Sequence, residues 1–176
     1  SLISTNNIKF ISAGLDSSFA LSLTDGVFAF GNNDFGQLGD NTTYTRYFPV
    51  QIFEDHPLFK IISCHGYSFA IDKNYQVYSW GRNEFGQLGT NDTNPLHFPT
   101  DITHYFGLEV VIDIACGTAH SLAVTSSGRV FSWGKNKNGE LGRLTSGNFS
   151  PIPAMIEGLL NIKRVIKVAA GGAHSL

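Results

Sequence analysis

Short apolar runs, separated by turn residues and polar stretches, recur along the whole chain. The first run of each unit is rich in β-branched residues and has the length of a β-strand. These first strands are predicted at Ile8–Ala13, Phe59–Ser63, Val110–Cys116 and Val165–Ala170. A short helical turn competes with strand only at Leu108–Ala115 and Glu157–Lys167.

Three further strands follow the first one in each full unit. Second strands are predicted at Ser18–Leu23, Ser68–Ile71 and Ser121–Thr125, and third strands at Val27–Phe30, Val77–Trp80 and Val130–Trp133. Asp25-Gly26 and Ser127-Gly128 predict tight hairpin turns between them. The fourth strands are predicted to begin with proline, which suits an outer edge strand that need not donate every ladder hydrogen bond. They are Pro49–Ile52, Pro99–Ile102 and Pro153–Glu157.

A glycine motif follows the third strand of every full unit. Its copies are Gly31–Gly39, Gly81–Gly89 and Gly134–Gly142, and their starts lie 50 and 53 residues apart. Four antiparallel strands per period of this size indicate a β-propeller blade. The sequence therefore predicts an all-β fold, one propeller segment over residues 1–176. Its repeats span about 8–58, 59–108 and 109–162, with a partial fourth at 163–176.

Neighbouring blades must stack, because a single four-stranded sheet cannot bury both of its faces. Small residues recur on the second strand, where larger side chains would push adjacent sheets apart: Ala20, Ala70 and Ala123. Ring-bearing residues end the third strand and are expected to fill the wider outer gap between blades: Phe30, Trp80 and Trp133.

The third unit carries a recognisable family pattern. Its segments Cys116–Val124 and Gly128–Trp133, together with the Gly-x-Asn-x-x-Gly-Gln-Leu-Gly pattern, resemble the regulator-of-chromosome-condensation repeat. The resemblance covers the whole chain in three copies and a partial fourth. Some positions depart from the pattern: Cys64 replaces a glycine, Ser17 and Tyr67 replace the histidine matched by His120 and His174, Phe30 replaces tryptophan, and Glu140 replaces glutamine.

The resemblance implies a closed seven-bladed propeller, of which this chain would form an arc of about three and a half blades. An open arc would expose large apolar faces, which monomers rarely tolerate. We therefore expect the remaining blades in the same, longer chain. The resemblance also implies guanine-nucleotide exchange on a Ran-like small GTPase as one function. That activity depends on an inserted wedge in one blade, which these units lack, so no exchange residue is carried over. The alternative is a non-catalytic interaction platform within a larger ubiquitin ligase, kinase or trafficking factor.

The glycine motif itself is interpreted as structural. It lacks the Lys-Ser/Thr of a P-loop and no helix follows it, so turn geometry explains its glycines better than phosphate binding does. Its leucines are predicted to plug the blades. The residues assigned structural roles are Gly31, Gly36, Leu38, Gly39, Gly81, Gly86, Leu88, Gly89, Gly134, Gly139, Leu141, Gly142, Trp80, Trp133 and His120.

No catalytic constellation emerges from the sequence. Ser18, Ser68, Ser121 and Ser175 occupy equivalent positions, whereas a nucleophile would be unique, and no Gly-x-Ser-x-Gly elbow occurs. Cys116 and His120 are spaced like one half of a metal site, but no second pair completes the four ligands. We expect no enzyme activity, cofactor or metal in this segment.

Composition narrows the classes of partner. The net charge is −2, and residues 1–112 sum to −6 while 113–176 sum to +4. This weak basic bias falls short of a nucleic-acid footprint, and no apolar run is long enough to span a bilayer. Cys64 and Cys116 lie in apolar runs and are predicted to be buried free thiols. Together with the family resemblance, that prediction favours an intracellular protein, cytoplasmic or nuclear.

The loops after the glycine motif differ most between units, and a repeat scaffold commonly presents its recognition groups on such loops. The residues predicted to contact a protein partner, a small GTPase among the candidates, are Tyr44, Arg46, Tyr47, His97 and Phe149. Tyr and Arg are frequent in interface hot spots.

Overall fold

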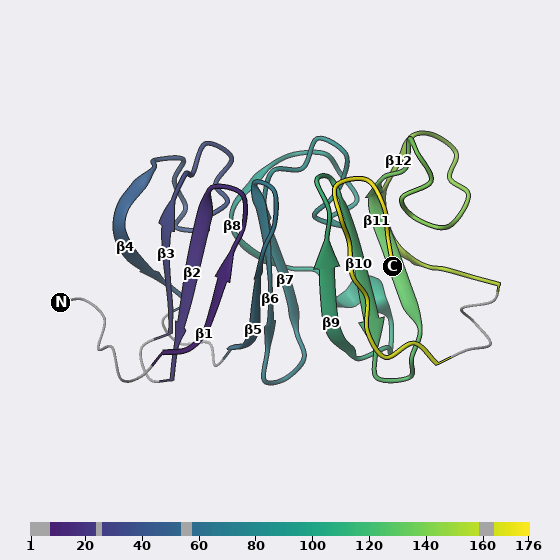
Figure 1. Cartoon of the computed structure of the whole chain (residues 1–176), viewed down its shortest axis with the longest axis horizontal. Helices are drawn as coiled ribbons and strands as arrows, with labels where there is room; N and C mark the ends of the chain where they lie inside the picture. The colour runs from purple at the N-terminus through teal and green to yellow at the C-terminus, as the bar shows by residue number, and fades with distance from the viewer. Residues whose placement is uncertain (1–7, 24–25, 54–57, 159–163) are drawn as a thin grey trace.

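The computed structural model describes residues 8–23, 26–53, 58–158 and 164–176. Three four-stranded antiparallel sheets stand side by side along the molecule (Figure 1). The first blade contains β1 (Ile8–Ala13), β2 (Ser17–Ser22), β3 (Val27–Gly31) and β4 (Arg46–Ile52). The second contains β5 (Leu58–Ser63), β6 (Tyr67–Asp72), β7 (Val77–Gly81) and β8 (Leu96–Asp101). The third contains β9 (Val111–Cys116), β10 (His120–Thr125), β11 (Val130–Lys135) and β12 (Phe149–Met155). The predicted propeller fold is confirmed.

The outer strands differ from the prediction in where they begin. Pro49, Pro99 and Pro153 lie inside β4, β8 and β12 rather than at their first positions. Each outer strand shows a register shift against its neighbour, between Ala29 and Gly31 in the first blade and at the matching places in the other two. Because the outer edge of the strand has no neighbour, a proline there costs no ladder hydrogen bond.

Two other local predictions need correction. The helical alternative at Leu108–Ala115 is wrong, since β9 covers most of it and the one short helix of the described chain is the 3₁₀ turn η1 (Thr103–Phe106). The predicted strand Val165–Ala170 does not form; in its place an isolated bridge joins Ala170 to Ser175. This segment lacks the paired neighbours that the equivalent strands have. Residues 159–163 of the second helical alternative and Asp25 of the first hairpin turn lie outside the described residues.

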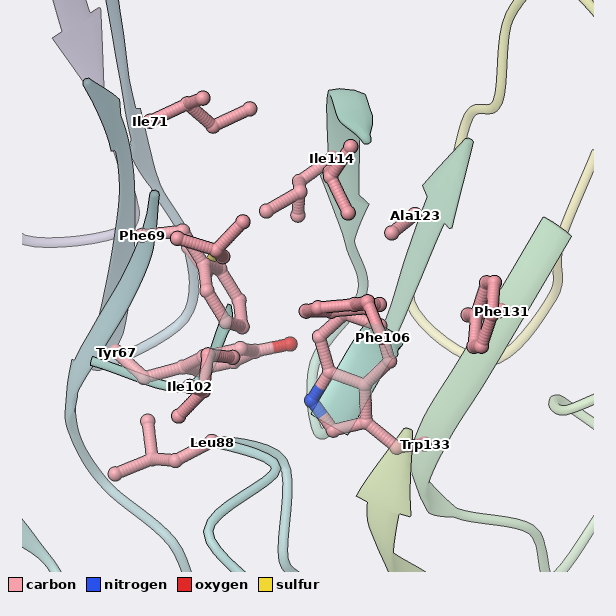
Figure 2. Packing of buried hydrophobic residues seen from close by; sticks show 13 residues of the cluster. Tyr67, Phe69, Ile71, Leu88, Ile102, Phe106, Ile114, Ala123, Phe131 and Trp133 are labelled. Atoms are coloured by element: carbon pink, nitrogen blue, oxygen red, sulfur yellow. The ribbon is translucent and has the colours of Figure 1, made fainter. Parts of the chain in front are cut away.

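The core lies in the seams between blades, as Figure 2 shows for the second and third blades. Trp133 of β11 is fully buried there and meets Phe69 of β6 edge-to-face, with 5.7 Å between ring centroids. Phe106 of η1 packs on the same indole at 5.8 Å. Leu88 of the glycine motif is also fully buried in this cluster. Each blade therefore becomes stable by covering the face of the next one.

The two cysteines correct another prediction. Cys64 and Cys116 form a disulfide, with 5.8 Å between their Cα atoms, and are not free thiols. Cys64 follows β5 and Cys116 ends β9, so the bond joins the second blade to the third. Sequence spacing did not reveal this pairing, because 52 residues separate the cysteines and only blade stacking brings them together. The bond also removes the thiol-based argument for a reducing compartment.

Candidate interaction surface

The long connections after β3, β7 and β11 gather at one edge of the molecule, the upper edge in Figure 1, hereafter the motif edge. One asparagine organises each connection. The Asn83 carboxamide oxygen accepts the Leu88 backbone N–H at 2.9 Å, and its nitrogen donates to Thr90 Oγ1 at 3.1 Å and to the Asn94 carbonyl at 2.9 Å. Equivalent bonds to the leucine N–H are made by Asn33 (2.9 Å) and Asn136 (3.0 Å).

These asparagines were not singled out from the sequence, although the motif contains them in all three copies. Asn33 and Asn83 are almost fully buried. A side chain that both accepts and donates across a loop fixes its shape more firmly than the glycines alone. The sequence signal that could have identified these asparagines is their recurrence at the third position of every motif copy.

In the first blade an ion pair fixes the loop further. Arg46 Nε donates to Asp40 Oδ2 at 2.6 Å, and Thr42 Oγ1 donates to Asp40 Oδ1 at 2.7 Å. Burial alone would raise the pKa of Asp40, but hydrogen bonds from Thr42, Arg46 and Asn33 outweigh it and hold the pKa below its ordinary value. Arg46 therefore braces the loop from within.

Tyr44 is the most prominent aromatic group on this braced loop. Its side chain is 72% exposed, and its backbone N–H donates to Thr42 Oγ1 at 3.3 Å. Phe149, at the start of β12, is 41% exposed. These two side chains lie on different blades and do not form one cluster.

His97 lies in a seam between blades. A Cβ added to Gly36 of the first blade would come within 2.5 Å of its ring, and the Asn41 N–H donates to the His97 carbonyl at 2.9 Å. Pro151 contacts Gly86 in the same way in the next seam. Tyr47 occupies the equivalent place on the first blade, where no described residue covers it, and it is 88% exposed.

The leucines, glycines and tryptophans predicted to be structural differ in where they lie. Leu38, Leu88 and Leu141 are fully buried, and every motif glycine has a positive φ. Trp80 and Trp133 donate their indole N–H to the carbonyls of Gln37 and Gln87 in the preceding blade, both at 2.8 Å.

An equivalent serine hydroxyl donates to the same carbonyl in each seam. The bonds are Ser68 to Gln37 and Ser121 to Gln87, both at 3.0 Å, and Ser175 to Glu140 at 2.6 Å. The repeated serines therefore join blades. This geometry gives a structural reason for their repetition.

His120 is buried at the start of β10, with Nε2 lying 3.1 Å from Ser175 Oγ. Burial lowers its pKa, an effect that Glu140 and a backbone hydrogen bond with His174 partly oppose. Ser175 and His174, which interact with this side chain, belong to the segment that follows the third blade.

Charged side chains extend across the seams at the motif edge. The Arg82 guanidinium lies 5.3 Å from the Phe35 ring centroid, and Lys135 Nζ lies 5.6 Å from that of Phe85. Cations near the ring face attract the π-system. In the third motif Asn138 replaces the phenylalanine, so this motif has no aromatic ring for a cation of the following blade to contact.

The repeat geometry agrees with a family assignment. The model of the regulator of chromosome condensation (RCC1) repeat matches residues 24–71, 76–124 and 127–176. The chain belongs to the RCC1 repeat family. A second RCC1 repeat model matches residues 8–37 and 111–140.

Relatives of this RCC1 chain include a receptor and a ubiquitin ligase. It is 36% identical over 171 residues to the ultraviolet-B receptor UVR8 of Arabidopsis thaliana, covering 96% of this chain and 38% of the receptor. It is 46% identical over 66 residues to the E3 ubiquitin-protein ligase HERC2 of Mus musculus, covering 38% of this chain and 1% of the ligase.

Among solved structures, Prp20p of Saccharomyces cerevisiae superposes with a TM-score of 0.81 at 22% identity. The match covers 96% of this chain and 43% of Prp20p, and at this identity it supports the fold alone. The chain thus spans less than half the length of each of these proteins. Within its described part, no helix is long and apolar enough to cross a membrane.

Proposed function

We propose that this RCC1 propeller segment is a protein-interaction module that binds its partner at the motif edge. The observation that carries this proposal is Tyr44, an exposed aromatic side chain on a loop whose backbone is braced by Asn33, Asp40 and Arg46. A rigid loop loses little conformational entropy on binding, so an aromatic group displayed on it contributes efficiently to affinity. No catalytic step is proposed for the segment.

Of the five side chains nominated from the sequence, Tyr44 and Phe149 are the ones proposed to touch a partner. Arg46 holds the loop through Asp40. His97 covers Gly36 between blades, and the equivalence of Tyr47 to His97 supports a seam role for that tyrosine too. Direct binding of nucleic acid is not proposed.

A Ran-like small GTPase is the first candidate partner, with nucleotide exchange as the accompanying activity of the complete protein. It is supported by membership of the RCC1 family and by the likeness to Prp20p, whose structure is described together with binding to Gsp1p and histones. The second candidate is a recruiting platform within a larger protein. The match to a short part of the HERC2 ubiquitin ligase supports it.

The test uses two measurements on the complete protein. Release of labelled GDP from a panel of small GTPases reports exchange, and binding of the same GTPases in their nucleotide-free form reports docking. Stimulated release supports the exchange function, and docking without release supports the platform. If neither is observed for any GTPase, the small-GTPase partner is wrong.

Tyr44→Ala and Tyr47→Ala form a matched pair for that binding assay. Tyr44→Ala is expected to weaken partner binding by at least about tenfold, as truncation of an interface hot spot does, with an unchanged unfolding midpoint. Tyr47→Ala should instead change stability in the complete ring and leave affinity alone. Equal affinities for wild type and Tyr44→Ala would remove this loop from the interface.

A further inference from the structure

Cys64 occupies a position where the chain comes unusually close to the following blade. Gly14 and Gly117 stand at the same place in the first and third units. A Cβ added to Gly14 would lie 2.2 Å from the Cys64 carbonyl oxygen, and one added to Gly117 would lie 2.4 Å from the Gly171 carbonyl oxygen. The second unit thus has a side chain where the other units require none.

The close approach is used for a covalent bond. Cys64 bonds to Cys116, the last residue of β9. Ser63 and Ala170 occupy the position of Cys116 in the neighbouring units. Among the described residues, this cysteine pair joins the second and third blades, whereas a hydrogen bond near the equivalent place joins the first and second blades. Ser17 Oγ and Ser63 Oγ, 2.9 Å apart, link the first blade to the second.

The disulfide borders an open cavity of about 320 Å³. Backbone and side chains of Leu15, Ser63, His65 and Thr118 line the cavity together with both cysteines. Cys64 is only 5% exposed, whereas Cys116 is partly exposed. Because Cys116 is the more exposed residue of the pair, we expect a thiolate entering from this cavity to attack it.

The rest of the seam does not depend on the disulfide. Trp133, Phe69, Leu88 and Phe106 pack between the same two blades. The Tyr67 hydroxyl donates to one of two nearby carbonyls, those of Gly117 at 2.9 Å and His120 at 2.8 Å. Breaking the sulfur bond would leave this core in place. It would remove a covalent constraint on the two short connections beside the cavity, residues 64–66 and 117–119, which lie at the motif edge.

We propose that the Cys64–Cys116 disulfide is a reversible redox lock on the motif edge between the second and third blades. A dithiol reductant attacks Cys116 and forms a mixed disulfide while Cys64 leaves as a thiolate. The second thiol of the reductant then displaces Cys116, so the protein gains two thiols and the reductant becomes a disulfide. The reduced protein stays folded, with mobile connections beside the cavity.

The test is reduction of the intact chain by dithiothreitol under native conditions, followed by alkylation and mass spectrometry. Reduction is expected while the tryptophan fluorescence of the folded state persists. Amide exchange of Cys64 and Gly117 should then accelerate, because their N–H groups donate to Tyr67 and His120 across the released connections. The Gly14 amide, bonded in the same way to Ser17, serves as the internal reference.

The double variant C64G/C116A supplies the matched control, since it carries the residues found in other units. It is expected to fold and to exchange its amides as the reduced protein does. Dithiothreitol should not change its amide exchange. Three outcomes would overturn the proposal. They are free thiols in protein purified without reductant, reduction only after unfolding, and unchanged exchange at Cys64 and Gly117 after reduction.

Discussion

The seam between the second and third blades and the seam that follows the third blade start from the same glycine motif but are filled differently. In the former, Trp133 covers Gly89, and its ring nitrogen would lie 3.0 Å from a Cβ added there. In the latter, a Cβ added to Gly142 would meet only Ile156, at 3.6 Å. A cavity of about 330 Å³, lined by Leu122, Val130 and other apolar side chains, lies beside the open motif.

The hydrogen bonds of the two seams show the same contrast. The Gln87 carbonyl accepts both Ser121 and Trp133, whereas among the described residues the Glu140 carbonyl accepts only Ser175. The comparison shows that each glycine motif forms a recess that receives side chains of the following blade, hereafter the socket. Its own residues set the shape, and the indole and hydroxyl of the following blade fill it.

Leucine truncation gives the largest expected difference between the seams. Leu88→Ala should lower the free energy of unfolding by about 2–5 kcal/mol, because a fully buried side chain leaves a cavity. Leu141→Ala should cost less, since Leu141 already borders the open cavity. Urea unfolding of both variants measures the difference. Equal losses of unfolding free energy in the two variants would mean that the seam between the second and third blades is not packed more tightly than the seam after the third blade.

The asparagine that organises each loop is the next target. Asn83→Ala should cost about 1–3 kcal/mol, because the buried Leu88 N–H loses its acceptor. Asn94→Ala is the control, since that exposed side chain lies in the same loop. Thermal unfolding compares the two. A similar loss for both would show that the buried carboxamide does not organise the loop.

The smallest expected effect is a pH dependence in the first blade. The pKa of Asp40 is lowered in the folded state, so its contribution to stability is present above the ordinary carboxyl pKa and is lost as the pH falls through the folded value. In the variant Asp40→Asn, the free energy of unfolding should therefore fall less steeply as the pH is lowered into the acid range. If the variant and the wild type lose stability equally steeply, the Arg46 pair contributes nothing measurable.

Most of the fold could be predicted from the sequence because local pattern and repeat period point to the same blade. Ala70 and Trp80, which the sequence predicts to lie between blades, are both fully buried. The predicted start at Pro99 failed because proline has two acceptable places on an edge strand, and only the pairing with β7 decides between them.

The candidate surface was harder to predict from sequence. Tyr44 and Tyr47 are three residues apart in one loop and strand, and composition does not distinguish an exposed loop tip from a seam position. The Cys64–Cys116 bond was missed for the same reason, since it depends on how the second and third blades stack. Contacts between repeats are not encoded in the pattern of a single repeat.

The central claim, that each glycine motif is a socket for the following blade, is tested most directly by Gly86→Ala against Gly139→Ala in the 176-residue chain. Both glycines have positive φ, 71° and 81°, so both variants carry a backbone cost of about 1–2 kcal/mol. A Cβ at Gly86 would lie 2.3 Å from Pro151 Cα, whereas one at Gly139 has nothing within 4 Å.

Unfolding in urea should show Gly86→Ala to be less stable than Gly139→Ala by roughly a further 1–3 kcal/mol, the typical cost of overpacking. Equal free energies of unfolding for the two variants would contradict the socket, because the motif would then act through its own turn geometry alone.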